Sequence, residues 1–184
     1  MMQQRAAAVT FERPQIGKWL FCCGSVSQVM GKQVVTLVRH TQWLHLELEP
    51  SQLVTNACQA VQPTLENLMQ TVPEEEGVIL SIVRKPTTTG VKLRPDLVIA
   101  GMAEVAVSLL RSHTWQGLFL SGGDTAEAVL TATGATAIIL YEEVLPGLVR
   151  GEIIGGTCDT LPVVTKAGAF GTGNTLINLI NILK

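Results

Sequence analysis

The chain has 184 residues, of which 47% are hydrophobic and 15% are charged, and its formal net charge at pH 7 is −2. This length and apolar content fit one folded domain with a sizeable core and exclude a disordered chain. The slightly negative charge gives no electrostatic reason to expect nucleic acid or an anionic membrane as a partner.

The residues that most often bind metals show no metal-binding pattern. The cysteines and histidines are Cys22, Cys23, Cys58, Cys158, His40, His45 and His113. No two cysteines form a C-x-x-C pair and no two histidines have H-x-x-x-H spacing, so the sequence predicts no metal site. Cys22 and Cys23 are neighbours in an apolar run, and we expect them to be buried on opposite faces of a strand.

Apolar stretches at the beginning of the chain and near residues 128–141 are too short for a signal peptide or a membrane span, which needs roughly 20 apolar residues. We therefore expect a reduced, cytoplasmic protein.

The first third of the chain alternates predicted strands and helices. Residues 18–23 form an apolar run that predicts a buried strand, and Ser27 in the turn that follows can cap a helix. Residues 43–48 carry leucine at every second position, which predicts a strand with one apolar face. A helix is expected to begin at Pro50, and Pro63 either kinks it or begins a second helix.

The remaining predicted elements continue the alternation. They are a strand at 77–83, a polar loop at 84–94, a helix from Pro95 to about Arg111, a strand at 117–120, a helix from Thr125 to Thr133, a strand at 137–140, a turn-rich β segment at 144–164 and a last helix containing Leu176 and Leu179. Such alternation predicts an α/β three-layer sandwich, with a mostly parallel sheet covered by helices on both faces.

Two glycine-bearing turns, at 121–126 and 165–174, each follow a predicted strand and precede a helix. A strand, a tight turn and a helix start direct backbone N–H groups and the positive end of a helix dipole at whatever lies above the turn. In parallel sheets, ligands bind beyond the carboxyl ends of the strands, where both turns and Gly24-Ser25 should lie. Phosphate binding is predicted, and a plain tight connection is the alternative. Neither G-x-x-x-x-G-K-[ST] nor an early G-x-G-x-x-G is present.

Three segments, taken together, carry a family resemblance. They are Gly24-Ser25-Val26-Ser27 with Gln33, Gly122-Gly123-Asp124-Thr125-Ala126, and Lys166-Ala167-Gly168-Ala169-Phe170-Gly171. In this order and at these separations they resemble the carboxy-terminal nucleotide-binding domain of the four-carbon acid sugar kinases. The resemblance covers about residues 18–184, and its specificity lies in the set of three. Met30 stands where the family commonly has threonine.

The resemblance implies an ATP-dependent kinase of carbohydrate metabolism that phosphorylates a hydroxyl of a threonate- or erythronate-like acid. It implies that this domain holds ATP with Mg²⁺. The nucleotide-binding positions that it implies are Ser25, Ser27, Gly122, Gly123, Asp124, Thr125, Lys166, Gly168 and Gly171. Lys166 would neutralise charge on the transferring phosphoryl group, and Asp124 would bind magnesium or water.

Each implied role has a structural alternative. Ser25, Ser27 and Thr125 would then be helix caps only. Asp124 would be a turn former, and Lys166 a solvated surface lysine. The remaining acidic clusters, Glu74-Glu75-Glu76 and Glu142-Glu143, are interpreted as solvated charges.

Full-length members of the family also have an amino-terminal domain that binds the acid through an Asp-Asp motif, and nothing in this sequence matches it. We therefore expect one nucleotide-binding domain over 1–184, with its core at about 18–184, that is inactive alone. The expected partners are ATP or ADP, a substrate-binding domain or subunit, and a second copy of the chain. The alternatives are a non-catalytic nucleotide-binding or oligomerisation module, and an unrelated α/β protein that binds another phosphate ligand.

Overall fold

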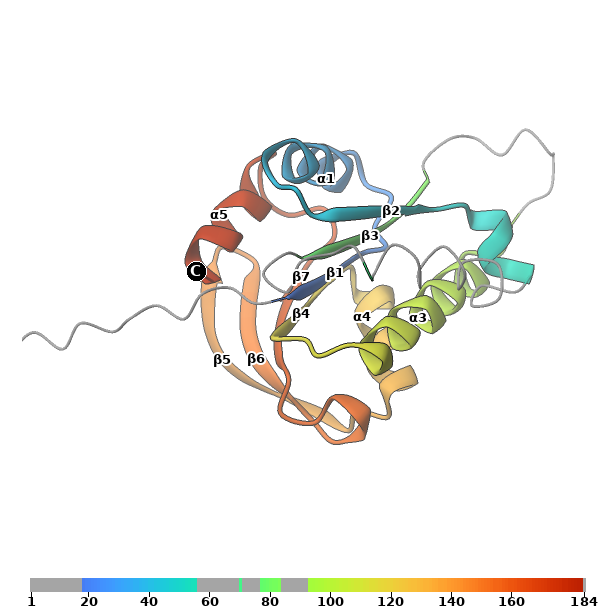
Figure 1. Ribbon diagram of the computed structural model, residues 1–184. Helices are drawn as coiled ribbons and strands as arrows, with labels where there is room; N and C mark the ends of the chain where they lie inside the picture. The colour runs from blue at the N-terminus through green and yellow to red at the C-terminus, as the bar shows by residue number, and fades with distance from the viewer. Residues whose placement is uncertain (1–17, 56–69, 71–76, 84–92, 184) are drawn as a thin grey trace, which may run out of the picture.

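One seven-stranded sheet, in the order β2-β3-β1-β4-β7-β6-β5, organises the computed structural model (Figure 1), which describes residues 18–55, 70, 77–83 and 93–183. The strands are β1 (Trp19–Cys23), β2 (Leu44–Leu48), β3 (Val78–Ile82), β4 (Gly117–Ser121), β5 (Ala137–Leu145), β6 (Leu148–Ile154) and β7 (Pro162–Lys166). Neighbouring strands from β2 through β7 pair in parallel, while β6 is antiparallel to both β7 and β5. The carboxyl ends of the five parallel strands therefore meet at one edge.

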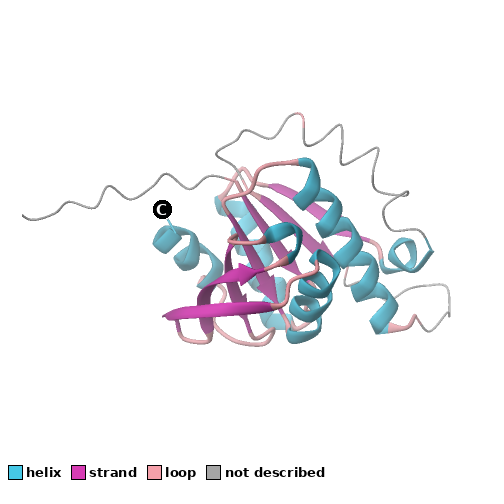
Figure 2. Ribbon diagram, turned by 90° about the horizontal axis from the view of Figure 1, so that it is seen from below, coloured by secondary structure: helices cyan, strands magenta, loops and turns pink. Residues whose placement is uncertain are grey.

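Helices cover both faces of the sheet. In Figure 1, α1 (Gln28–His40) and α5 (Thr175–Leu183) lie above the sheet, while α3 (Pro95–Ser112) and α4 (Gly123–Thr133) lie below it. The view from below in Figure 2 shows the β5–β6 hairpin at one end of the molecule. The predicted α/β three-layer sandwich is confirmed.

The strand β1 shows how the sequence divides the core into two layers. Its residues alternate, so Phe21 and Cys23 pack under α1 and α5, while Leu20 and Cys22 pack against α3 and α4. A strand buried on both faces is expected to be apolar throughout, and all five residues of β1 are buried. The prediction that Cys22 and Cys23 are buried on opposite faces is confirmed.

Two predicted boundaries were wrong. The helix expected to begin at Thr125 begins at Gly123, because Gly122 adopts a positive φ of 101° and ends the extended backbone two residues earlier. The strand expected to end at Leu140 continues to Leu145, because β5 keeps pairing with β6 past two register shifts. Glu142 and Glu143 are exposed in this part of the strand, so their charges remain in contact with water. Predictions for residues 1–17, 56–69, 71–76 and 84–92, including Cys58, Pro63 and the Glu74 cluster, lie outside the described residues.

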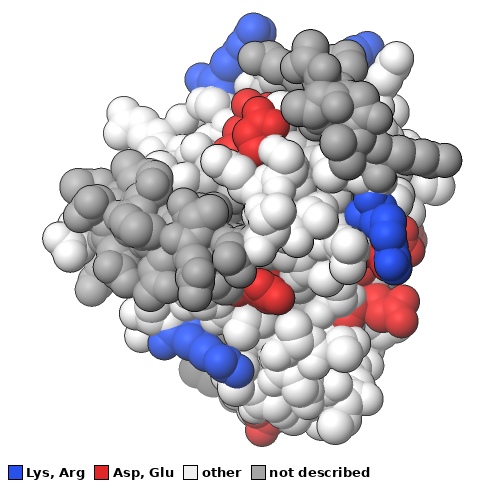
Figure 3. All heavy atoms as spheres, turned by 90° about the vertical axis from the view of Figure 1, so that its right-hand side faces the viewer, with Lys and Arg blue, Asp and Glu red and all other residues white. Residues whose placement is uncertain are grey.

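Surface charge is sparse. On the face shown in Figure 3, Lys and Arg side chains lie at separate places, one of them beside Asp or Glu side chains, and do not form a continuous basic stripe. Within the ranges that the structure describes, no helix combines the length and the hydropathy needed to cross a membrane.

Candidate nucleotide site

The neighbouring strands β1 and β4 lead to helices on opposite faces of the sheet. β1 continues into α1 on one face, and β4 continues into α4 on the other. The chain thus diverges between the turn after Cys23 and the turn after Ser121, which leaves a crevice at the carboxyl edge. In open α/β sheets this topological switch point is where ligands bind.

Three turns meet at this crevice so closely that Gly24 and Gly168 have no room for a Cβ. A Cβ on Gly168, in the turn after β7, would lie 2.6 Å from Ser25 Oγ and 3.6 Å from Gly122 Cα. A Cβ on Gly24 would lie 2.2 Å from Thr125 Oγ1. Gly168 lies in the turn after β7, Ser25 in the turn after β1 and Gly122 in the turn after β4. The three sequence segments therefore come together as predicted.

Ser27 connects the first turn to the third. Its Oγ accepts a hydrogen bond from Met30 N at 3.1 Å, capping α1, and donates one to Gly168 O at 3.0 Å. The predicted cap is confirmed, but capping is not its only contact. Ser25 Oγ accepts a hydrogen bond from Ser27 N at 3.3 Å. Met30, at the position where threonine is common, is buried in the core beneath α1 and adds no polar group to the turn.

The turn after β4 presents open space at the beginning of α4. Gly122 has the positive φ that favours glycine, and its N–H donates to Lys166 O at 3.0 Å. A Cβ on Gly123 would have no atom within 4 Å, and both Gly123 and Asp124 are exposed. Thr125 is 2% exposed inside the first turn of α4, so the alternative that it is the N-cap is wrong.

A cavity of about 580 Å³ lies beside the turns after β1 and β4. This size is typical of small-molecule sites. Its polar side consists of Gly24, Ser25, Ser27, Gly122, Gly123, Asp124 and Thr125. Its apolar side consists of Pro50, Ile82, Val83, Leu93, Val98 and Ile99, among others. Lys166, Gly168 and Gly171 do not line this cavity. They belong to the loop behind it, which touches the site through Ser25.

Lys166 is buried, so the alternative that it is a solvated surface lysine is wrong. Its side chain is 3% exposed, and Nζ donates to Ala167 O at 2.9 Å and to Gly168 O at 3.3 Å. Burial lowers the pKa of Lys166 from its usual value. On the neighbouring strand β1, burial raises the pKa of Cys23 to about 12, which keeps this thiol protonated and neutral at pH 7.

Gly171 is exposed, but the direction in which a side chain would point is filled by neighbouring atoms. Its φ is 86°, and a Cβ there would lie 2.4 Å from Thr175 Oγ1 and 3.0 Å from Gln33 Nε2. The need for glycine at this position is thus explained by packing within the chain.

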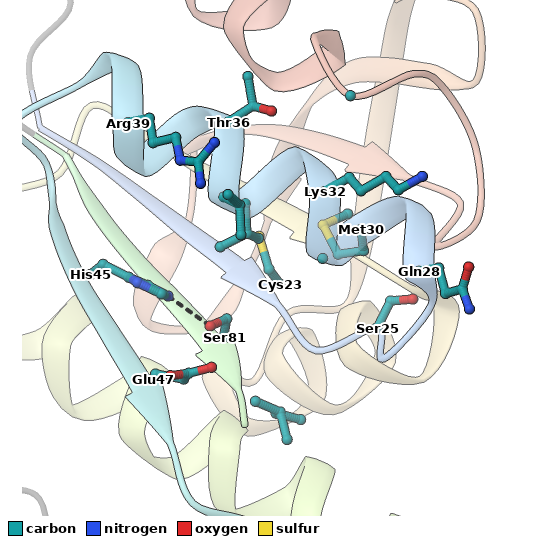
Figure 4. Close-up of a pocket in the computed structure, with 15 residues that line it drawn as sticks. Cys23, Ser25, Gln28, Met30, Lys32, Thr36, Arg39, His45, Glu47 and Ser81 are labelled. Atoms are coloured by element: carbon teal, nitrogen blue, oxygen red, sulfur yellow. Dashed lines mark hydrogen bonds between the residues drawn. The ribbon is translucent and has the colours of Figure 1, made fainter. Parts of the chain in front are cut away.

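Sequence reasoning missed a second cavity, of about 600 Å³, between α1 and the ends of β2 and β3 (Figure 4). His45 and Ser81 lie on its floor with Nε2 and Oγ 2.8 Å apart, while Arg39 reaches toward them from α1. Burial lowers the pKa of His45, with Glu47 opposing this effect. The signal was the alternation along β2, where His45 and Glu47 oppose the leucine face. Ser25 and Ile82 line both cavities.

Metal-binding side chains do not gather in either cavity. Across residues 18–55, 77–83 and 93–183, no cluster of three or more His, Cys, Asp or Glu is placed to hold a metal ion. Asp124 is the acidic residue at the glycine turns, and it lies in the first turn of α4, where a carboxylate also favours the helix dipole.

A family model described as a nucleotide-binding C-terminal domain matches residues 20–176. The chain belongs to this family. The matched range includes all three turns and the strands that precede them, so the family assignment and the geometry of the switch point concern the same part of the molecule.

Curated relatives of this nucleotide-binding domain are sugar-acid kinases. The chain is 40% identical to a D-threonate kinase of Bordetella bronchiseptica over 92 residues, which are 50% of this chain and 23% of the relative. It is 30% identical to a D-threonate kinase of Salmonella typhimurium over 136 residues, 73% of this chain and 32% of the relative. A D-erythronate kinase of Heliobacterium modesticaldum is 32% identical over 85 residues, 45% of this chain and 19% of the relative.

Solved structures share the fold. A domain of unknown function from Bordetella bronchiseptica, crystallised with bound citrate as a domain-swapped dimer, has a TM-score of 0.80 and 28% identity over 91% of this chain and 41% of its own. A Haemophilus influenzae protein with 16% identity and a TM-score of 0.71, covering 98% of this chain and 43% of its own, shows the fold alone. The chain thus spans less than half the length of these relatives.

Proposed function

We propose that this chain is the ATP-binding part of a four-carbon acid sugar kinase, which phosphorylates a threonate- or erythronate-like acid when joined to a substrate-binding domain. The observation that carries the proposal is the meeting of three glycine turns at the topological switch point, where a Cβ on Gly168 would lie only 2.6 Å from Ser25 Oγ and 3.6 Å from Gly122 Cα. The family membership and the kinase relatives support the same function.

The two sides of the first cavity suit the two parts of ATP. Its apolar side, which includes Ile82, Val98 and Ile99, offers a surface for the base. Its polar side offers the first-turn N–H groups of α4, which begin at Gly123 and have no partner within the helix, and these favour phosphate together with the helix dipole. Mg²⁺ would enter with the nucleotide, and the exposed Asp124 in the first turn of α4 would be the carboxylate that meets it. Such a site contributes positioning and electrostatic stabilisation to phosphoryl transfer.

We expect the substrate half of the activity to come from a further domain or subunit. The chain matches only 23% and 32% of the lengths of two D-threonate kinases, which leaves their remaining residues to supply the acid-binding groups. We expect this chain alone to bind nucleotide without transferring phosphate, in the cytoplasm. A second copy is a further expected partner, since one structural relative forms a domain-swapped dimer.

Calorimetric titration with ATP and ADP tests the proposal. Binding by the wild-type chain is expected, while Gly123→Phe should abolish it and leave the circular dichroism spectrum unchanged, because the new side chain enters open space above the turn. Ala132→Phe, an equally large change on the exposed surface of the same helix, is the control and should bind normally. Absence of ATP and ADP binding at millimolar nucleotide would contradict the proposal.

A further inference from the structure

The loop after β7 is held from beneath by side chains that reach its carbonyl oxygens. Lys166 Nζ donates to Ala167 O at 2.9 Å and Gly168 O at 3.3 Å, and Ser27 Oγ adds a second hydrogen bond to Gly168 O. Lys166 is almost fully buried, so these bonds are shielded from water. The ammonium group therefore binds its own loop.

Gln33 holds the other half of the same loop. Its Nε2 donates both hydrogens, to Phe170 O at 2.9 Å and to Thr172 O at 2.9 Å. The side chain is fully buried and comes from the middle of α1, more than 130 positions away in the sequence. Gly171 packs on this amide, since a Cβ there would lie 3.0 Å from Nε2. The contact thus depends on both Gln33 and the glycine.

The geometry of the peptide bond relates these hydrogen bonds to the directions of the backbone N–H groups in the loop after β7. In a planar trans peptide, the C=O of one residue and the N–H of the next point in opposite directions. Lys166 binds the carbonyls of Ala167 and Gly168, and Gln33 binds those of Phe170 and Thr172, so the N–H of the residue after each carbonyl points away from the side chain that binds it. The residues that carry these N–H groups are Gly168, Ala169, Gly171 and Gly173. Successive backbone N–H groups of this kind, as at Gly168 and Ala169, form anion-binding concavities in other proteins.

We infer that Lys166 and Gln33 are positioning residues that hold the loop after β7 with its amides outward, and that these amides bind a nucleotide phosphate. The inference rests on the proposed function and sharpens it, since the sequence predicts that the Lys166 cation meets the phosphoryl group directly. In this inference, the uncharged Gln33 on α1 contributes in the same way as Lys166 at the end of β7. Equal effects of Lys166 and Gln33 on nucleotide binding therefore distinguish a positioning role from direct contact between the Lys166 cation and the phosphate.

Nucleotide titrations of two variants test the inference. Lys166→Met and Gln33→Met each remove the donors at similar side-chain length, and each should weaken both ATP and ADP binding about 10-fold, the effect of a lost buried hydrogen bond. Lys166→Arg keeps donors to two carbonyls and should restore most of the affinity. Gln28→Met is the control, because Gln28 is exposed on α1, the helix that carries Gln33, and this variant should bind normally.

A direct phosphate contact by Lys166 predicts a different pattern. Lys166→Met would then weaken ATP more than ADP, while Gln33→Met would bind both normally, and this result would overturn the inference. Because a variant that loses a buried donor could fail to fold, amide NMR on the wild type gives a second test. The signals of Gly168, Ala169 and Gly171 should shift on adding ADP, with Gly134 at the far end of α4 as the reference.

Unchanged loop amides in a wild-type chain that binds ADP would also overturn the inference. Failure of the proposed function gives a separate result, because the wild type itself would then bind neither ATP nor ADP.

Discussion

At the scale of single residues, the packing of the glycine turns leaves no space for a Cβ at some positions. Gly24 illustrates this, because a Cβ there would meet Thr125 Oγ1 at 2.2 Å and Met102 Sδ at 3.2 Å. Glycine at this position lets the turn after β1 pack directly on the first turn of α4. Sequence inspection found the glycine but could not find its partner, which lies 101 positions later in the chain.

A double-mutant cycle measures this packing. Gly24→Ala should lower the free energy of unfolding by about 1–3 kcal/mol, as overpacking of a filled interior does. Adding Thr125→Ala removes the opposing oxygen, so the double variant should lose less stability than the sum of the two single variants. Urea unfolding of the four proteins gives the coupling, and strictly additive losses would contradict the close contact.

At the scale of elements, β2 combines a core face with a polar face. Leu46 and Leu48 are buried against the α3 side, while His45 and Glu47 line the cavity beneath α1. The alternation of leucines was readable in the sequence. The partner of His45 was not, because Ser81 belongs to β3 and the register between the two strands depends on the whole sheet.

The pH dependence of stability should report on His45. Burial lowers its pKa below the usual 6.5, so the unfolded chain binds more protons than the folded one below that value. The free energy of unfolding should therefore fall as the pH is lowered from 7 through the folded-state pKa. His45→Gln removes the titrating ring and should make this decline shallower in urea unfolding between pH 7 and 5. Equal slopes for the two proteins would contradict the burial of the imidazole.

The elements show where sequence patterns suffice and where they do not. The helix α3 was predicted nearly to the residue, because Pro95 marks its start and Val98, Met102 and Val105 repeat at helical spacing. The start of α4 was missed because it depends on the positive φ of Gly122. The contacts of Lys166 and Gln33 could not be predicted either. Each side chain donates to backbone carbonyl groups, and every residue has such a group whatever its type.

At the scale of the whole molecule, the catalytic activity should require a second component. A coupled assay with four-carbon acids should show no phosphoryl transfer by this chain alone, and transfer should begin when the substrate-binding domain of a related kinase is added. The reason is that the described residues offer the cavity and glycine turns to which we assign the nucleotide, while the relatives carry far more chain than the matched part. Transfer by the chain alone would contradict this division of labour. Nucleotide binding without transfer in the mixture would favour the non-catalytic module.

Ser25 and Ile82 form a wall common to the two cavities at the carboxyl edge of the sheet. A molecule that displaces this wall from the α1 side changes the shape available on the α3 side. If occupants of both cavities contact this wall, their binding is thermodynamically linked, and each changes the affinity for the other by the same factor. Two shared side chains, Ser25 and Ile82, are then the place where such a link would arise.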